Sequence, residues 1–248
     1  MLEVNGVSAG YRNVHILDEV SIAAQPNQIT VIVGPNGSGK STLLKTIAGL
    51  TTIYKGSISL DGKRVSGLPP HQIARLGIAY LPQTESTFTR LTVAENFKMA
   101  GYTVGRQEYD ARLAKALTLF PKLSSYMKSR VSNLSGGERQ MVAMTMALLR
   151  KPNTIMFDEP TANLAPMIAT QVLNTIAYLS KESNTTILLV EQNATRALQI
   201  GQYAYLLVSG RLAFQGTTES LLEHKELGRL YLGANVSSET EGASTKRP

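Results

Sequence analysis

The sequence lacks several residue types and patterns that would point to whole classes of protein. It has no cysteine, which excludes disulfide bonds and thiolate metal sites, and its three scattered histidines do not suggest a histidine metal centre. No apolar run approaches the roughly 20 residues needed to span a bilayer. The segment Met1–Gly6 lacks the basic-then-apolar pattern of a signal peptide. These absences predict a soluble, cytoplasmic protein.

Aromatic residues are also few, at 6% of the chain, and the basic residues do not gather into one block. Both observations argue against a stacking platform for nucleic acid, and we expect no nucleic-acid partner. The net charge of +7 suits a surface that faces phosphates or anionic lipid headgroups equally well. With 248 residues, the chain fits either one α/β domain with an inserted subdomain or two small domains.

One stretch matches the phosphate-binding pattern G-x-x-x-x-G-K-[ST]. It consists of Gly34, Pro35, Asn36, Gly37, Ser38, Gly39, Lys40, Ser41 and Thr42. A loop that wraps a triphosphate must point backbone N–H groups inward, and glycines keep its inner wall free of side chains. Lys40 is expected to reach the β- and γ-phosphates, and the Ser41 hydroxyl to ligate Mg²⁺.

The alternative is a glycine-rich turn that matches by chance, with odds of roughly one in a hundred for a chain of this length. The context favours the functional interpretation. Residues 28–33 are typical of a buried strand and residues 43–48 of a helix, which is the strand–loop–helix setting that the pattern requires. The stretch therefore predicts a nucleotide site with ATP as the ligand.

Two adjacent carboxylates, Asp158 and Glu159, follow the apolar strand expected at 153–158. Asp158 stands where a Mg²⁺ partner belongs, and Glu159 is free to polarise an attacking water. Neighbouring strand residues point to opposite faces, so the two carboxylates are not expected to share one task. The alternative is an ordinary charged turn before Pro160, which is improbable behind a phosphate loop.

A second glycine-rich stretch, Leu-Ser-Gly-Gly-Glu-Arg-Gln, occupies residues 134–140. Ser135 is a good N-cap, and Glu138 three residues later completes a capping box. The glycines Gly136 and Gly137 at a helix N-terminus offer a second anion site. A purely structural, well-capped helix is the alternative.

The remaining pattern predicts an α/β fold with a mixed central sheet, an N-terminal antiparallel β part and an inserted α-helical part. The antiparallel part is expected through about Ile32, with turns at Asn5-Gly6 and at 25–27. A further strand is expected at 56–62, ending in an Asp-Gly turn at Asp61-Gly62. Other strands are expected at 77–83, 185–190 and within 203–216, and helices at 91–97, 109–120, 135–150, 166–180 and 219–232. We expect one domain over 1–236, with 84–150 as its helical subdomain, and a disordered tail at 237–248.

Together these stretches resemble the ATP-binding subunits of ATP-binding cassette (ABC) transporters, from about residue 3 to residue 234. The resemblance implies that residues 134–140 form the signature, in which Ser135 to Glu138 contact the γ-phosphate bound by a partner subunit. Two subunits would then hold two ATP molecules head to tail. It also implies that Tyr11 stacks on adenine and that Gln83 contacts Mg²⁺ and the attacking water; a core tyrosine and a loop glutamine are the alternatives.

Two positions depart from the family pattern. Ala165 stands where the family usually has an aspartate, and Gln192 where it usually has a histidine. The Gln192 amide can hold the γ-phosphate and water but cannot carry a proton near neutral pH. A catalytic role of Gln192 is therefore not expected to include acid–base chemistry. An alternative interpretation is therefore that the chain is a subunit that binds ATP but hydrolyses it poorly.

The departures, with residues 90–96 and 230–234, resemble the ATPases of branched-chain amino acid importers. That resemblance implies two permease subunits, a second ATPase subunit that is identical or not, an external binding protein, and a place on the cytoplasmic face of the membrane. Importers of amides or urea and lipopolysaccharide exporters look similar. A soluble cassette protein of DNA maintenance is disfavoured because no long coiled coil separates Thr42 from Leu134, and translation-type versions usually carry two cassettes.

Overall fold

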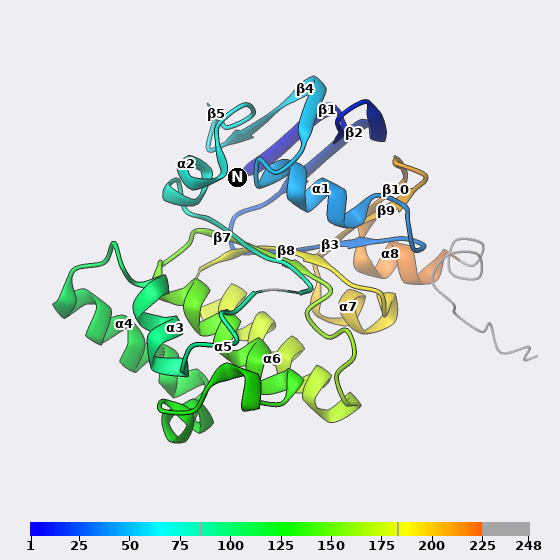
Figure 1. The fold of residues 1–248 in the computed structure, drawn as a ribbon. Coiled ribbons are helices and arrows are strands. Elements are labelled where there is room, and N and C mark those ends of the chain that lie inside the picture. The colour runs from blue at the N-terminus through cyan, green and yellow to red at the C-terminus, as the bar shows by residue number, and fades with distance from the viewer. Residues whose placement is uncertain (85, 183, 225–248) are drawn as a thin grey trace, which may run out of the picture.

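The computed structural model describes residues 1–84, 86–182 and 184–224, which fold into two sheets with helices around them (Figure 1). The smaller, antiparallel sheet contains β1 (Leu2–Tyr11), β2 (Val14–Ala24), β4 (Thr52–Leu60) and β5 (Lys63–Arg64). Its strand order is β2-β1-β4-β5. The Asp61-Gly62 turn between β4 and β5 confirms the predicted Asp-Gly reversal, with both residues at positive φ.

The predicted turn at Asn5-Gly6 is wrong. Strand β1 continues through both residues, and the chain reverses later, at Arg12 and Asn13. Gly6 has φ +55° and lies at a register shift between the pairs Val4–Ile22 and Val7–Val20, which is a β-bulge. A glycine at positive φ suits a bulge as well as a turn, and here pairing resumes on both sides of it.

The central sheet contains β3 (Ile29–Val33), β6 (Ile78–Leu81), β7 (Thr154–Asp158), β8 (Thr186–Val190), β9 (Tyr203–Val208) and β10 (Arg211–Thr217). Its order is β10-β9-β3-β8-β7-β6, parallel except for β10. The expectation that the antiparallel part extends to about Ile32 is therefore wrong, because β3 pairs in parallel with β8 and β9. The mixed sheet confirms the predicted fold class.

The helices are α1 (Lys40–Ile47), α2 (Pro70–Arg75), α3 (Val93–Ala100), α4 (Arg106–Leu119), α5 (Gly136–Leu149), α6 (Pro166–Glu182), α7 (Ala194–Ile200) and α8 (Thr218–Glu223). Two 3₁₀ segments, η1 (Pro121–Tyr126) and η2 (Val131–Asn133), lie between α4 and α5. Sequence reasoning did not identify the short helices α2 and α7. The part of the closing helix predicted beyond residue 224 and the tail at 237–248 lie outside the described residues.

The central sheet separates two hydrophobic cores. Helix α1 lies between the two sheets, whereas α5 and α6 cover the opposite face of the central sheet (Figure 1). Alternation along β7 divides its side chains accordingly: Met156 packs toward α1, and Ile155 and Phe157 pack toward the helices. Burying each such side chain stabilises the fold by about 1.5–3 kcal/mol. Within the described ranges, no helix is both long and apolar enough to cross a membrane.

Candidate functional site

Parallel strands bring four loops to one edge of the central sheet. The glycine-rich loop follows β3, Gln83 follows β6, Glu159 follows β7 and Gln192 follows β8. Because β3, β8, β7 and β6 are consecutive neighbours in the sheet, residues from distant parts of the sequence meet at the carboxyl ends of these strands. Such an edge is where open α/β sheets bind ligands.

The glycine-rich loop has a backbone that only glycine tolerates at its start. Gly34 has φ +148°, and a Cβ added there would lie 2.0 Å from the Leu207 carbonyl oxygen. Gly39 caps α1 in the left-handed conformation, and no side chain caps this helix end. The first-turn N–H groups of α1 therefore point toward the loop without a side-chain acceptor, which suits an anion.

Two buried side chains inside this loop fit a phosphate ligand. The Ser38 hydroxyl is buried and, within the described part of the chain, has no hydrogen-bond partner. The Lys40 ammonium donates to the carbonyls of Gly34 (2.9 Å) and Pro35 (3.0 Å), and only 5% of this residue is exposed. Burial lowers the pKa of Lys40, and the negative charges of Glu159 and Asp158 oppose this shift.

Asp158 is held by hydroxyl groups from two other elements. Its Oδ1 accepts from Ser41 Oγ at 2.8 Å, and its Oδ2 accepts from the Tyr80 hydroxyl at 2.9 Å. Burial first, and then the Asp158 carboxylate, raise the pKa of Tyr80, so the phenol keeps the proton that it donates. Sequence reasoning did not select Tyr80. The signal available was a tyrosine in a buried strand, three residues before Gln83.

Glu159 lies just beyond β7 and has a different hydrogen-bond partner from those of Asp158. Its Oε2 accepts from Gln83 Nε2 at 2.9 Å. Its backbone has φ +49°, an uncommon conformation for a non-glycine residue, and its N–H donates to the Val190 carbonyl at 2.9 Å. Burial raises the pKa of Glu159, and the Lys40 charge opposes this rise. A raised pKa makes the carboxylate a better base.

A further buried carboxylate, Glu191, was missed from the sequence. It is 2% exposed, and its Oε1 accepts from the Thr161 N–H at 3.0 Å. Burial raises the pKa of Glu191, and hydrogen bonds from Thr161 and the Gln192 N–H oppose the rise. The available signal was an acidic residue directly after the apolar strand β8, as Glu159 stands after β7. Glu191 therefore joins the loop after β8 to the loop after β7.

The two departures from the family pattern both lie on exposed loop positions. The Gln192 side chain is exposed, and among the described residues no hydrogen bond links it to Glu159. The Ala165 carbonyl accepts the Ala169 N–H at 2.9 Å as α6 begins. Within the described residues, neither side chain makes a hydrogen bond with Lys40 or Asp158.

The second glycine-rich stretch forms the N-terminus of α5, and its capping box is confirmed. Ser135 Oγ accepts from the Glu138 N–H, while Glu138 Oε2 accepts from the Ser135 N–H and hydroxyl at 2.9 Å each. Gly137 packs so closely on α6 that an added Cβ would lie 2.3 Å from Ile168 Cγ2. A cleft of about 940 Å³ extends from Gln83 and Glu159 to Gly136. Helices α5 and α1 lie on opposite sides of the central sheet, so the two helix N-termini lie in different layers (Figure 1).

Tyr11 ends β1 and is 41% exposed, which makes a simple core role wrong. The turn after it is supported by Tyr54, whose hydroxyl donates to the Arg12 carbonyl at 2.6 Å and whose ring stacks on His15 at 4.0 Å between centroids. The ring of Tyr11 is thus presented at a supported corner of the antiparallel sheet.

A separate apolar groove of about 410 Å³ lies between α2, β6, α3 and α5. Its rim includes three large side chains that are about half exposed: Leu50, Phe88 and Met99. Pro82 and Ser86, on either side of Gln83 in the chain, also line it. The groove therefore adjoins the loop that carries Gln83.

Comparisons with known proteins agree on one family. The family profile described as "ABC transporter" matches residues 17–162. The chain is 52% identical over 233 residues to the probable branched-chain amino acid transport ATP-binding protein LivF of Archaeoglobus fulgidus, covering 94% of this chain and 99% of that protein. It is 39% identical to the high-affinity branched-chain amino acid transport ATP-binding protein BraG of Pseudomonas aeruginosa, covering 94% and 100%. A crystal structure of a nucleotide-free ATP-binding cassette from an ABC transporter superposes with a TM-score of 0.82, at 26% identity, over 92% of this chain and 96% of that one.

Proposed function

Since the chain belongs to the ABC transporter family, as an ATP-hydrolysing subunit, we propose that it energises a membrane importer of branched-chain amino acids. The solute rests on the relatives, two of which are named for branched-chain amino acid transport. The ATPase chemistry rests on one observation above the others: Lys40, Asp158 and Glu159 converge at one sheet edge and interact electrostatically.

ATP is bound by groups from several elements. The phosphates lie against the backbone N–H groups of residues 36–42, with Ser38 Oγ and Lys40 turned toward them, and the adenine lies against Tyr11. Lys40 would exchange the carbonyls of Gly34 and Pro35 for phosphate oxygens, which offer an ammonium a stronger, charge-assisted contact.

Hydrolysis uses Glu159 as the base that orients and polarises the attacking water. Gln83 holds the Glu159 carboxylate by their hydrogen bond, and Gln192 contributes contacts to the γ-phosphate and water without transferring a proton. The uncommon φ of Glu159 and its Val190 contact fix the backbone from which this side chain extends.

The residues present also fit Mg²⁺, which takes oxygen ligands and is held by few protein groups beside phosphate. Ser41 Oγ, Asp158 and the Gln83 amide oxygen supply such donors, and Ser41 and Asp158 already lie 2.8 Å apart. Bound there, the ion would neutralise charge on the β- and γ-phosphates. Tyr80 keeps the Asp158 carboxylate in place.

Two subunits close head to tail on two ATP molecules in this proposal, and we call that assembly the two-ATP dimer. Residues Ser135 to Glu138 contact the γ-phosphate held by the partner, Glu138 through its backbone and not through its carboxylate. ATP favours the closed dimer because this contact exists only in the closed state, and a ligand shifts a conformational equilibrium only by the difference in its affinity for the two states. The partner is a second copy or a related ATPase, and the ATPase domain comprises 1–236 with 84–150 as its helical part.

The apolar groove beside Gln83 is the proposed docking site for a cytoplasmic segment of a permease subunit. Half-exposed Leu50, Phe88 and Met99 on its rim suit an apolar helix. Docking there holds the chain on the cytoplasmic face of the membrane, and an external binding protein delivers the solute to the permeases.

The experiment that tests the catalytic part is Glu159→Gln. Loss of the base predicts hydrolysis at least about 100-fold slower, with ATP affinity within a few-fold of the parent chain. Phosphate release and equilibrium binding measure the two quantities, and Glu223→Gln, an exposed change on α8, is the control. Unchanged hydrolysis in Glu159→Gln contradicts the assignment.

The transporter part is tested by isolating the tagged chain from detergent-solubilised native membranes. Two permeases and a second ATPase subunit are the expected partners, and an amino-acid-binding protein would support the solute. Recovery of soluble partners only would contradict the transporter role and leave the ATPase chemistry standing.

A further inference from the structure

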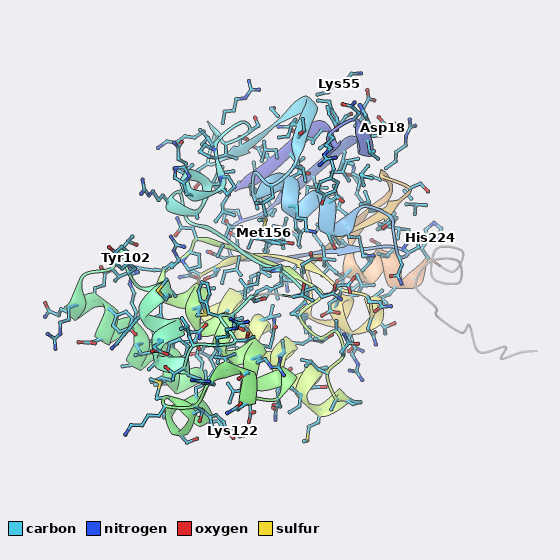
Figure 2. The ribbon with its side chains drawn as sticks, viewed as in Figure 1. Asp18, Lys55, Tyr102, Lys122, Met156 and His224 are labelled. Atoms are coloured by element: carbon cyan, nitrogen blue, oxygen red, sulfur yellow. The ribbon has the colours of Figure 1, made fainter. Side chains whose placement is uncertain are left out.

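Lys122 lies outside every motif in the sequence, yet it contacts the signature directly. It stands on η1, at the edge of the helical part (Figure 2). Its ammonium lies 2.8 Å from Glu138 Oε1 and 5.8 Å from the centroid of the Tyr126 ring. The side chain of Lys122 is 62% exposed and that of Glu138 only 12%. A largely buried carboxylate therefore has its counter-ion at the surface.

The Glu138 carboxylate has three partners. Oε2 accepts from the Ser135 N–H and hydroxyl, Oε1 accepts from Lys122, and the Tyr126 hydroxyl also donates to the carboxylate. Lys122 is the largest cause that lowers the pKa of Glu138 to about 2, followed by the Ser135 N–H. The capping box is thus ionised and oriented at any physiological pH.

An ionised Glu138 creates an electrostatic problem for the proposed ligand. The N-terminus of α5 attracts anions through its dipole and its first-turn N–H groups. A carboxylate three residues into the helix cancels much of that attraction and repels a γ-phosphate. Lys122 balances the charge of the Glu138 carboxylate, and Ser135 and Gly136 remain exposed.

We propose that Lys122 is a positioning residue of the signature: it neutralises and orients Glu138, so that residues 135–137 accept the γ-phosphate of the partner's ATP. This inference rests on the two-ATP dimer proposed above. The alternative interpretation is that the Lys122–Glu138 ion pair only holds η1 against α5. The two interpretations predict different results when the charges of Lys122 and Glu138 are removed together.

In this test the full chain carrying Glu159→Gln is the parent to which every further change is added. Analytical ultracentrifugation measures ATP-driven dimerisation over a range of ATP concentrations. Because Lys122 is exposed, we take the range of a surface charge pair, which shifts an equilibrium by up to about fivefold, and a symmetric dimer contains the pair twice. We therefore expect Lys122→Met to need about threefold to 30-fold more ATP for half-maximal dimer. Lys122→Arg, which keeps the charge, should dimerise close to the parent.

Lys128→Met is the matched control, because Lys128 is an exposed lysine on the same helical part. ADP affinity checks folding in each variant, since ADP binds the chain's own phosphate loop and lacks a γ-phosphate. The double change Lys122→Met with Glu138→Gln should recover most of the loss, because a glutamine still completes a capping box and carries no charge.

Each outcome decides between the readings. If Lys122→Met dimerises like the parent, or the double variant stays as impaired as Lys122→Met, the role of Lys122 is wrong while the two-ATP dimer stands. If the parent itself does not dimerise with ATP, the two-ATP dimer of identical copies and the role of Lys122 in it are both overturned.

Discussion

Gly137→Ala tests whether the signature is held by close packing of α5 on α6. The added Cβ would lie 2.3 Å from Ile168 Cγ2, more than 1 Å inside ordinary van der Waals contact. That methyl is attached at Cβ of Ile168, so it moves only if χ1 changes, and a β-branched residue in a helix strongly prefers one χ1 rotamer. The neighbouring change Gly136→Ala meets only the terminal Leu164 Cδ2, at 3.2 Å.

The magnitude follows from two opposed effects. An overlap of this size falls in the upper part of the overpacking range, about 2–3 kcal/mol, and replacing a helical glycine by alanine returns about 1 kcal/mol. The net loss for Gly137→Ala is therefore about 1–2 kcal/mol, which lowers the Tm of a chain of this size by about 2–8 °C. For Gly136→Ala the flexible methyl yields, and we expect Tm within about 2 °C of the parent chain.

Thermal and urea unfolding of the nucleotide-free chain, followed by circular dichroism, measures packing separately from ligand binding. Ile168→Ala supplies the partner for a double-mutant cycle, because it removes the methyl that clashes. We expect the double variant with Gly137→Ala to be more stable than the sum of the two single losses, by about 1 kcal/mol. Equal stability of Gly136→Ala and Gly137→Ala, or strict additivity in the cycle, would refute this account.

Two other predictions concern the sheet edge. Gly34→Ala should abolish nucleotide binding in an equilibrium assay, since its Cβ would lie 2.0 Å from the Leu207 carbonyl oxygen at a φ of +148°; retained affinity would contradict the close approach. Burial raises the pKa of Glu191, so the folded state binds the proton of this carboxyl group more tightly than the unfolded state does. The resulting stabilisation of the fold is present at acidic pH and is lost as pH rises through the raised pKa. Glu191→Gln should therefore gain stability relative to the parent chain as pH rises from about 4 to 8, measured as the difference in Tm, and a pH-independent difference would rule this out.

The sequence predicted local features well. The capping box of Ser135 and Glu138, the Asp61-Gly62 turn and the strand–loop–helix around Lys40 all formed as expected. The prediction at Asn5-Gly6 was wrong because positive φ at glycine serves a bulge as well as a turn. The choice depended on β2 and β4, which pair with β1 on both sides.

Residues that act through distant partners escaped sequence reasoning. Tyr80 and Asp158 are 78 positions apart, Thr161 and Glu191 are 30 apart, and Lys122 contacts Glu138 from a different helix. Each looks ordinary in the sequence, as a strand tyrosine, a loop acid or a surface lysine. Their chemistry exists only once the strand order brings their partners close.

The sequence by itself determined the family, the phosphate loop and the identities of the groups that handle ATP, because these depend on residue types at short spacings and on hydrogen bonds within one turn. Only the tertiary structure decided which of these groups meet. The order β3-β8-β7-β6 places Asp158 against Ser41 and Glu159 against Gln83. Such contacts require a whole sheet to assemble, since the entropy of closing long loops is offset only when many strands pair together.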